Sequence, residues 1–332
     1  MQIRRLNPAE DAGELAASLP VAERWRSDFT PGLPVFREAR LRLWATDGYQ
    51  QRATVLGAFA DEQSTEPEGI AIFGIELTKN LEAADLTLLV PAAARDRGVH
   101  ALLLDEARRM TAELGRKRLV VEMPETEDPA AFAQQRGEAK YTDTPIASRL
   151  DLSEIDRAQY EAWAAPSAKN SQYTLVRWIG RCPDEYTESY CAALDAMSDA
   201  PMGEAQYEWA KNDVERLRFN EEQTEQFGVR RYVQAAVDPD GHVAGFHLLA
   251  AYPDEPADIN VWDTGVVRAH RGHGLGLRVK AAAALWVLED RPDTRWMFTF
   301  NNSENTWMLA VNRTMGYRPI GDWKGYEFAV TG

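Results

Sequence analysis

The chain has 332 residues, of which 45% are apolar, and it carries a formal net charge of −15. This length is natural for two domains, and the apolar content is sufficient for packed cores. The acidic balance argues against a surface that binds nucleic acid or an anionic membrane, so neither is an expected partner.

Cysteine, histidine and leader patterns predict a cytoplasmic protein without a metal centre. The two cysteines, Cys182 and Cys191, are expected to be reduced, buried thiols. The five histidines are scattered and lack the spacing of a metal site. The N-terminus shows no signal-peptide pattern, and the apolar run 281–288 is too short to span a bilayer.

The first half of the sequence predicts alternating strands and helices. A strand is expected over 3–6, followed by a helix that Asn7 caps, that has Pro8 at its first position and that ends near Leu19. Further helices are expected over 36–43 and 99–115. Strands are expected over 53–60, 69–75, 84–90 and 118–121.

The second half repeats this alternation after a connecting region. The sequence Ser153-Glu154-Ile155-Asp156 predicts a capping box for a helix ending near Ala165, and residues 166–172 form a turn-rich linker. A hairpin is expected around Asp238-Pro239-Asp240-Gly241. The remaining elements expected are a strand at 174–178, helices at 183–197 and 207–219, a loop at 198–204, hairpin strands at 231–237 and 243–251, and a closing strand at 323–330.

A strand, a glycine-rich turn and a helix form the most informative motif. The strand around Val261–Val267 leads into Arg271-Gly272-His273-Gly274-Leu275-Gly276, and a helix over 277–289 follows. Glycine lacks a Cβ, so its backbone can take positive φ and approach a ligand closely. Free N–H groups and the positive end of the helix dipole favour a phosphate at such a turn. The spacing matches neither the Gly-x-Gly-x-x-Gly nucleotide fingerprint nor a P-loop.

The residues that follow the motif add a second signature. A strand over 295–300 precedes a helix that Asn305 leads, and Gly316-Tyr317 closes that helix. Together with Arg-x-x-Gly-x-Gly, this order resembles the GNAT superfamily of acyl-CoA-dependent N-acyltransferases, specifically over 259–320 and more loosely from 174. The resemblance implies acetyl-CoA or a related acyl-CoA as the donor. It also implies an α/β (α+β) fold with a mixed, mostly antiparallel central sheet flanked by helices.

An internal repeat predicts two such domains. Arg95 falls on Arg271 and Gly98 on Gly274 at one offset (271 − 95 = 274 − 98 = 176), and Gly137 falls on Gly316 at 316 − 137 = 179. We therefore expect a GNAT-like domain over 1–150, a linking helix and linker over 151–172, and a catalytic domain over 173–332.

The first copy is expected to be degenerate. His100, Asp96 and Glu138 stand where the second copy has Gly276, Gly272 and Tyr317, and the first copy offers no counterpart to the Asn that leads the second copy's helix. An imidazole at the last turn position obstructs a pyrophosphate, and an aspartate repels it. The first copy is thus a structural element or a wall of the acceptor pocket rather than a second active site.

The resemblance also implies how the cofactor binds. In this family the strand before the turn carries a bulge and splays from the next strand, and the pantetheine arm lies between them. Pantetheine is then expected on the end of the strand and pyrophosphate on the turn, while Asn305 contacts the cofactor arm or simply caps its helix. The expected cofactor-binding residues are Val266, Val267, Arg268, Arg271, Gly272, His273, Gly274, Leu275, Gly276 and Asn305.

Acyl transfer to an amine needs a neutral amine, a polarised carbonyl and a proton for the leaving thiolate. A backbone N–H near Val266 or Val267 can polarise the carbonyl. The resemblance implies a Tyr as the leaving-group acid seven residues after the helix Asn, but this chain has Asn312 there. An amide can hydrogen-bond sulfur but has no acidic proton to donate. Tyr317 is expected in the core.

The base is also displaced from the family position. A Glu six residues before Val266 is common in the family, and this chain has Asn260. Asp263 is the nearest carboxylate on the strand, and desolvation would raise its pKa towards the range useful for a base; a buried structural Asp is the alternative. Asp199 and Glu204 lie in a loop expected to border the acceptor pocket. The expected catalytic residues are Asp263, Glu204 and Asn312, with water as an alternative proton relay.

The expected function is therefore transfer of acetyl from acetyl-CoA to the primary amine of a small molecule, performed by the second copy. Two alternatives remain open: acetylation of a protein amine, and a non-catalytic acyl-CoA-binding sensor, which the missing Tyr and Glu motivate. The expected state is a monomer or homodimer.

Overall fold

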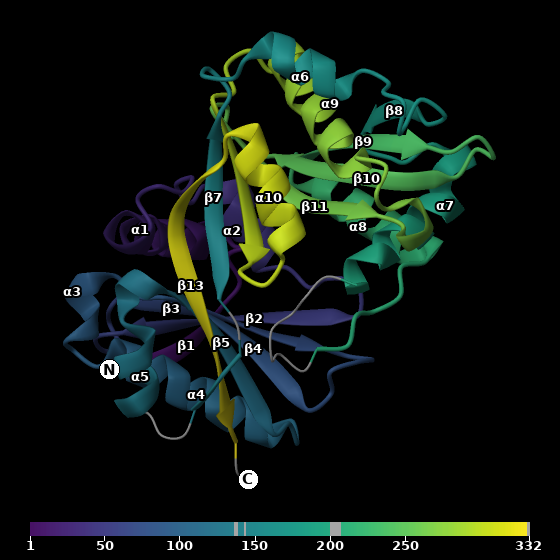
Figure 1. The fold of residues 1–332 in the computed structure, drawn as a ribbon. Coiled ribbons are helices and arrows are strands. Elements are labelled where there is room, and N and C mark those ends of the chain that lie inside the picture. The colour runs from purple at the N-terminus through teal and green to yellow at the C-terminus, as the bar shows by residue number, and fades with distance from the viewer. Residues whose placement is uncertain (136–138, 143, 200–206, 331–332) are drawn as a thin grey trace. The chain divides into compact units, whose positions relative to one another are not determined.

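The computed structural model describes residues 1–135, 139–142, 144–199 and 207–330, which divide into two compact units (Figure 1). The first unit comprises Met1–Ile146, Met202–Glu208 and Ile320–Gly332, and the second comprises Ala147–Pro201 and Trp209–Pro319. This division differs from the sequence boundaries 1–150 and 173–332 at the C-terminus, because the last strand pairs within the first unit.

The sheet of the first unit has the strand order β1-β2-β3-β4-β5-β13, with β6 paired to β13. Its pairings are antiparallel except for β4 with β5, which run parallel. The strands are β1 (Gln2–Leu6), β2 (Gln51–Phe59), β3 (Gly69–Glu76), β4 (Ala83–Leu89), β5 (Arg118–Pro124), β6 (Ala139–Tyr141) and β13 (Arg318–Ala329).

Helices cover this sheet through two apolar clusters. One cluster joins α1 (Ala12–Phe29) and α2 (Glu38–Trp44) to β2, β3 and β4. The other, larger cluster joins α4 (Val99–Glu113) and α5 (Pro129–Gln135) to β2–β5 and β13. The short elements α3 (Ala92–Arg95) and η1 (Glu125–Glu127) lie directly after β4 and β5.

The sheet of the second unit has the strand order β7-β12-β11-β10-β9-β8. The pairs β8–β9, β9–β10 and β10–β11 are antiparallel, and β11 and β12 are parallel. The strands are β7 (Pro145–Asp151), β8 (Thr174–Ile179), β9 (Arg230–Val237), β10 (Val243–Ala251), β11 (Asp258–Val266) and β12 (Trp296–Asn302).

Two groups of helices cover opposite faces of this sheet. The apolar cluster under α6 (Arg157–Ala164), α9 (Leu275–Asp290) and α10 (Thr306–Met315) includes Tyr232 and Leu249 from β9 and β10. The neighbouring residues of those strands, Val233 and Leu248, join the cluster under α7 (Thr187–Leu194) and α8 (Val214–Gln226). The short helices η2 (Asp184–Tyr186), η3 (Asp195–Asp199) and η4 (Arg268–His270) lie in connections. Each unit is thus a mixed, mostly antiparallel sheet flanked by helices, which confirms the predicted fold class.

Three helices begin elsewhere than the sequence signals predicted. The cap of α1 is Asp11 rather than Asn7, because the Asp11 carboxylate accepts from the N–H groups of Gly13 and Glu14. Similarly, Asp156 rather than Ser153 caps α6. The helix predicted over 207–219 instead occupies Val214–Gln226, where its cap is Asp213. In all three cases an aspartate is the N-cap residue, and its carboxylate accepts from N–H groups of the first turn.

Candidate functional site

The parallel strands of the second unit separate partway along their length. Strand β11 pairs with β12 only over Asp258–Asn260, although β11 continues to Val266 along β10. The register of β11 against β10 shifts by one residue, because Leu248 pairs with Asp263 and Leu249 with Val261, so Trp262 forms a bulge. A bulge bends and twists a strand. The remainder of β11 therefore keeps an edge that β12 does not use.

The glycine turn follows the free end of β11. Gly272 and Gly274 have φ of +85° and +74°, and Gly274 is the N-cap residue of α9. A Cβ built on Gly276 would have the Val266 side chain as its nearest contact, at 4.0 Å, so the turn presents open backbone. The first turn of α9 carries no acidic side chain. Its amide groups therefore form a site that favours an anion.

Two arginines of the turn share one carboxylate. Arg268 and Arg271 each approach Asp199 at the end of η3, with N–O distances of 2.7 Å. Arg271 also donates from Nε to the carbonyl of Val266, at 3.0 Å. Hydrogen bonds from Arg268 and then from Arg271 lower the pKa of Asp199. Asp199 was expected to border the acceptor pocket. Its carboxylate is instead the anion that the two arginines bind at the turn.

Side chains brace the turn from the segment before β8. Asn170 donates to the carbonyl of His273 at 3.1 Å, and the Tyr173 hydroxyl lies 3.0 Å from His270 Nδ1. The predicted cofactor residue His273 itself donates from Nδ1 to the carbonyl of His270, at 3.2 Å. Arg278 on α9 fixes the same segment by donating to the carbonyls of Asn170 and Tyr173. The turn is therefore held in shape before any ligand arrives.

The candidate base Asp263 lies on the bulged part of β11. It faces the same side of the sheet as Leu248, which packs under α7 and α8. Its side chain is partly buried, and desolvation raises the pKa of the carboxyl, although Arg231 on β9 opposes this effect. The raised pKa agrees with the sequence expectation and moves the carboxyl towards the range of a general base.

The two valines at the end of β11 differ in availability. Val266 packs in a small apolar cluster with Leu275 and Val279 of α9. The N–H of Val267 donates to the carbonyl of Ala244 at 2.9 Å. That N–H is therefore already engaged in the sheet. The N–H of Val266 is the better candidate for polarising the carbonyl of a thioester.

The two asparagines of α10 have distinct surroundings. Asn305 is the N-cap residue, and its side chain accepts from the N–H of Met308 at 3.2 Å. Asn312 is buried, and its Nδ2 donates to Asn301 of β12 at 2.7 Å. Tyr317 is buried beside α10, as expected for a core position. Within the described chain, Asn312 Oδ1 has no hydrogen-bond partner.

The first unit contains the same local construction. Strand β4 pairs with β5 only over Ala83–Leu86 and continues beyond this point along β3. Gly98 has φ of +79° and is the N-cap residue of α4. Arg95 donates from Nε to the carbonyl of Val90 at 3.4 Å, which is the counterpart of the bond from Arg271 to Val266.

A carboxylate closes this first turn from within. Glu127 is buried and pairs with Arg95, and its carboxylate also accepts from the Trp25 indole. His100, at the position of Gly276, is buried with Nε2 3.6 Å from Glu127, and its ring lies 4.5 Å from the tilted ring of Phe132. Burial lowers the pKa of Arg95 to about 10, so its guanidinium stays charged at neutral pH. The sequence did not reveal Glu127, because its distance of 32 residues from Arg95 gives no pattern.

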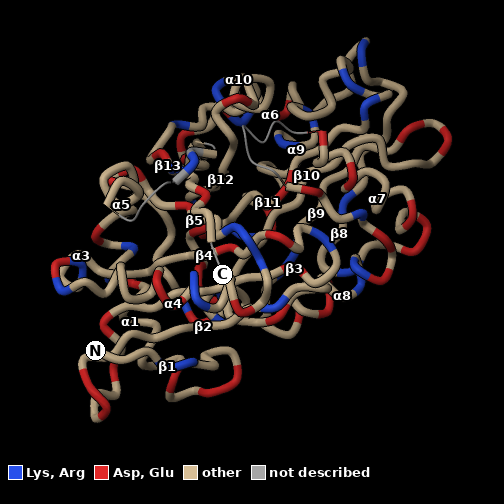
Figure 2. Tube along the Cα trace, turned by 90° about the horizontal axis from the view of Figure 1, so that it is seen from below, with Lys and Arg blue, Asp and Glu red and all other residues tan. Residues whose placement is uncertain are grey.

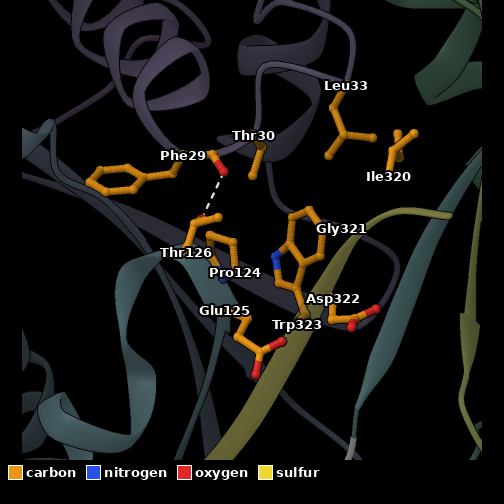
Figure 3. Close-up of a pocket in the computed structure, with 10 residues that line it drawn as sticks. All are labelled: Phe29, Thr30, Leu33, Pro124, Glu125, Thr126, Ile320, Gly321, Asp322 and Trp323. Atoms are coloured by element: carbon orange, nitrogen blue, oxygen red, sulfur yellow. Dashed lines mark hydrogen bonds between the residues drawn. The ribbon is translucent and has the colours of Figure 1, made fainter.

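A pocket of about 400 Å³ lies within the first unit, and Glu125 and Thr126, which precede Glu127 in the chain, line part of it (Figure 3). The Trp323 indole and the Leu33 and Phe29 residues border it, and Thr126 donates to the carbonyl of Phe29 at 2.8 Å. Its carboxylates, Glu125 and Asp322, are solvent-exposed. None of the residues that line the pocket belongs to the glycine turn of the second unit, which carries the predicted cofactor residues.

Several predicted residues lie outside the described ranges, namely Glu204, Gly137 and Glu138. Among the described residues, no cluster of three His, Cys, Asp or Glu side chains could hold a metal ion. No helix of the described chain combines the length and apolarity needed to cross a membrane. Figure 2 shows Asp and Glu distributed along both units and interspersed with Lys and Arg. Net acidity alone therefore identifies no binding surface.

The fold is shared with solved structures. A tandem GNAT protein from the clavulanic acid biosynthesis pathway superposes with a TM-score of 0.83 at 23% identity, over 100% of this chain and 99% of the other. A GCN5-related N-acetyltransferase from Sphaerobacter thermophilus gives 0.67 at 15% identity, over 100% and 96%. The N-myristoyltransferase of Saccharomyces cerevisiae, with bound myristoyl-CoA, gives 0.61 at 10%, over 100% and 79%. No family model and no curated protein matches the sequence.

Proposed function

We propose that this chain, which has the fold of the tandem GNAT proteins, is an acyl-CoA-dependent N-acyltransferase that acetylates the primary amine of a small molecule. The carrying observation is the free edge of β11, which ends in an open glycine turn flanked by Arg268 and Arg271. A strand edge suits an extended amide-containing arm, and the turn suits a pyrophosphate.

The residues at the turn fit the charge and shape of an acyl-CoA. Asp199 already shows that a carboxylate can bridge the two arginines, and it is solvent-accessible, so a phosphate can replace it. The backbone of Gly274 and Gly276 leaves room for the pyrophosphate against the N-terminus of α9. Val266 and Val267 would line the pantetheine arm, and Asn305 would contact it. The cofactor would bring the activated acyl thioester to the split between β11 and β12.

The residues of the split can serve the two proton requirements of the reaction. Asp263 lies on the side of the sheet under α7 and α8, where it can take a proton from an incoming ammonium, directly or through water. A backbone N–H at Val266 can polarise the carbonyl. Asn312, on the α10 side, can orient the sulfur by a hydrogen bond. Glu204 remains a second candidate base.

The test is continuous measurement of CoA release from acetyl-CoA with a panel of small primary amines, and mass spectrometry of the products. Amine-dependent CoA release with an acetylated small product supports the proposal. Acetylation of peptides or proteins alone would favour the protein-amine alternative. Tight acyl-CoA binding without release in any acceptor screen would favour the sensor.

Calorimetric titration tests the division of labour between the units. We expect one acyl-CoA per chain, because Glu127 and His100 close the first turn while the second is open. Two equivalent sites per chain would contradict this assignment.

A further inference from the structure

Five polar residues, four of them buried and Thr264 partly buried, form a layer on the α9 and α10 side of the second unit. The polar layer consists of His247, Thr264, Lys280, Asn312 and Tyr317. Lys280 on α9 is fully buried, and its Nζ has no hydrogen-bond partner within the described chain. It lies 4.9 Å from the centre of the Tyr317 ring. A buried ammonium or amine without a partner is costly, so its retention requires an explanation.

The polar layer reaches the part of β11 that has separated from β12. His247 on β10 is fully buried and shares a 2.8 Å hydrogen bond between its Nδ1 and the hydroxyl of Thr264 on β11. Its Nε2 and the Tyr317 hydroxyl find no partner among the described residues. Thr264 lies four residues beyond Asn260, the last residue of β11 to pair with β12. The layer therefore adjoins the place expected for the thioester.

Asn312 extends the polar layer to β12. Asn312 donates to Asn301 near the end of β12, and the N–H of Tyr317 donates to the carbonyl of Asn312 at 3.0 Å. Asn312 Oδ1 lacks a partner in the described part of the chain. Four unsatisfied polar atoms in one region are the usual signature of internal water.

The first unit shows that the fold does not need this layer. At the same offset of 176 residues, His247, Thr264 and Lys280 correspond to Ala71, Leu88 and Leu104. Ala71 pairs with Leu88 across β3 and β4, as His247 pairs with Thr264 across β10 and β11. All three apolar residues are buried in one cluster. At these three positions the polar residues thus belong to the copy whose glycine turn is open.

We propose that Lys280 supplies, through water held in the polar layer, the proton that the departing CoA thiolate takes up; this inference rests on the acyltransferase function proposed above. Lys280 acts through water and does not itself contact the substrate. It would supply the proton that Asn312 cannot, because an amide has no acidic proton.

The proton transfers balance over one turnover. The acceptor nitrogen attacks the carbonyl carbon, a C–N bond forms, and the C–S bond breaks with its electron pair on sulfur. The sulfur takes a proton from the layer, and the Lys280 ammonium becomes a neutral amine. The proton lost by the acceptor nitrogen passes to Asp263 or water on the other side of β11 and from there to solvent, and solvent returns one proton to Lys280.

Lys280 is the group of the polar layer that changes its protonation near neutral pH. Burial lowers the pKa of Lys280 to about 7. Burial also lowers the pKa of His247 well below its usual range, where the charge of Lys280 adds to the effect, and raises that of Tyr317. Both of these groups are therefore neutral at pH 7. From α6, Tyr160 faces Tyr317, and its hydroxyl donates to the carbonyl of Met315.

The charged groups on the other face of the sheet are separate from this layer. Asp263 of β11 interacts with Arg231 of β9 and with Tyr190 of α7. An acid with a pKa near 7 must be protonated to act, so the rate it supports falls as the pH rises through 7.

The test compares Lys280→Leu, which copies Leu104, with the unmodified protein. We expect kcat for CoA release to fall about 100-fold, the usual contribution of a proton donor. The decline of kcat above pH 7 should disappear. The dissociation constant of acetyl-CoA should change less than threefold. The melting temperature should stay the same or rise, since an unpaired amine leaves the core; Lys280→Met provides a second apolar variant if Leu packs poorly.

Two further comparisons separate a proton donor from a packing residue. Lys280→Arg retains the charge but holds its proton too tightly, so its kcat should also remain low. The acetyl thioester of thiophenol releases a thiolate that needs no proton, so both proteins should turn it over at similar rates. A packing defect would slow both substrates alike.

The possible results test the role of Lys280 separately from the proposed acyltransferase activity. An unchanged kcat and pH profile in Lys280→Leu, with the unmodified protein active, overturn the role of Lys280 and leave the acyltransferase standing. An unmodified protein that binds acetyl-CoA but releases no CoA with any amine overturns the acyltransferase and this inference together.

Discussion

The turns of the first and second units have the same local geometry, but their arginines pair with carboxylates of different burial. Each follows a strand that separates from its parallel neighbour, and each has an arginine bonded to the carbonyl five residues before it. In the first unit the arginine pairs with the buried Glu127, whereas in the second it pairs with the accessible Asp199. A ligand can displace an exposed carboxylate far more readily than one fixed in a core.

The strands before the turns differ as well. Strand β4 keeps one register against β3 from Ile70 to Gly74, while β11 gains the extra residue Trp262. The bulge therefore accompanies the open turn and not the fold itself. This difference teaches that side chains can fill a turn of this kind while every helix and strand around it remains.

The largest expected effect is the loss of stability when the buried carboxylate of Glu127 is removed from the first unit. Glu127→Ala leaves Arg95 partly buried without its partner, and breaking such a pair costs about 3–5 kcal/mol. Chemical denaturation should show this loss in the transition of the first unit. The exposed neighbour Glu125→Ala is the matched control and should change stability by less than about 0.5 kcal/mol. A new acyl-CoA site in Glu127→Ala would show that one side chain alone separates the two turns.

The second prediction makes the open turn resemble the closed one. Gly276→Glu places a carboxylate against the pyrophosphate position, so acyl-CoA affinity should fall about 100-fold or more, on the order of 2.7 kcal/mol. The φ of Gly276 is not positive, and the first unit tolerates His100 at this position, so the fold should persist. Gly276→Ala is the control and should retain affinity within a few-fold, as measured by calorimetry. Full affinity in the glutamate variant would remove the turn from the cofactor site.

The third prediction concerns the side chain that replaces the expected tyrosine. Asn312→Ala should lower turnover by about tenfold or less, the ~1.4 kcal/mol of one hydrogen bond. Asn312→Tyr should keep or raise activity if the ring fits. Steady-state kinetics with acetyl-CoA affinity measured in parallel will decide. A loss of several orders of magnitude at unchanged affinity would mean that Asn312 organises the reacting centre itself.

The smallest effect is expected at the exposed carboxylate. Asp199→Asn removes the internal competitor for Arg268 and Arg271, so acyl-CoA affinity should increase about threefold to fivefold, or roughly 0.7–1 kcal/mol. The gain should shrink at high salt, since surface ion pairs are screened. Titrations at two ionic strengths measure both quantities. Weaker binding in the variant would mean that Asp199 orients the arginines rather than competes for them.

Much of this comparison was predictable from the sequence. The offset of 176 residues aligned Arg95 with Arg271 and identified which turn was damaged, and periodicity located most strands and helices. The same offset could have revealed Lys280, because it sets a lysine against Leu104 on an apolar helix face. Helix starts were less predictable, since Asn7 and Asp11 both suit a cap and only packing selects between them.

Contacts between distant segments could not be predicted in this way. The pairings of Glu127 with Arg95 and of Asp199 with Arg271 depend on where short helical turns place a carboxylate, 32 and 72 residues away in sequence. The bulge at Trp262 depends on pairing register, which one strand's sequence does not specify.

The two buried cysteines have a practical consequence for work on this protein. Cys182 and Cys191 are not disulfide-bonded, and burial raises the pKa of their thiols to about 12 and 11. Thiol reagents attack the thiolate, which such groups hardly form at neutral pH. A chromogenic disulfide can therefore report released CoA in real time with little background from the folded protein. A single cysteine placed on the surface would likewise be the preferred point of attachment for a fluorophore.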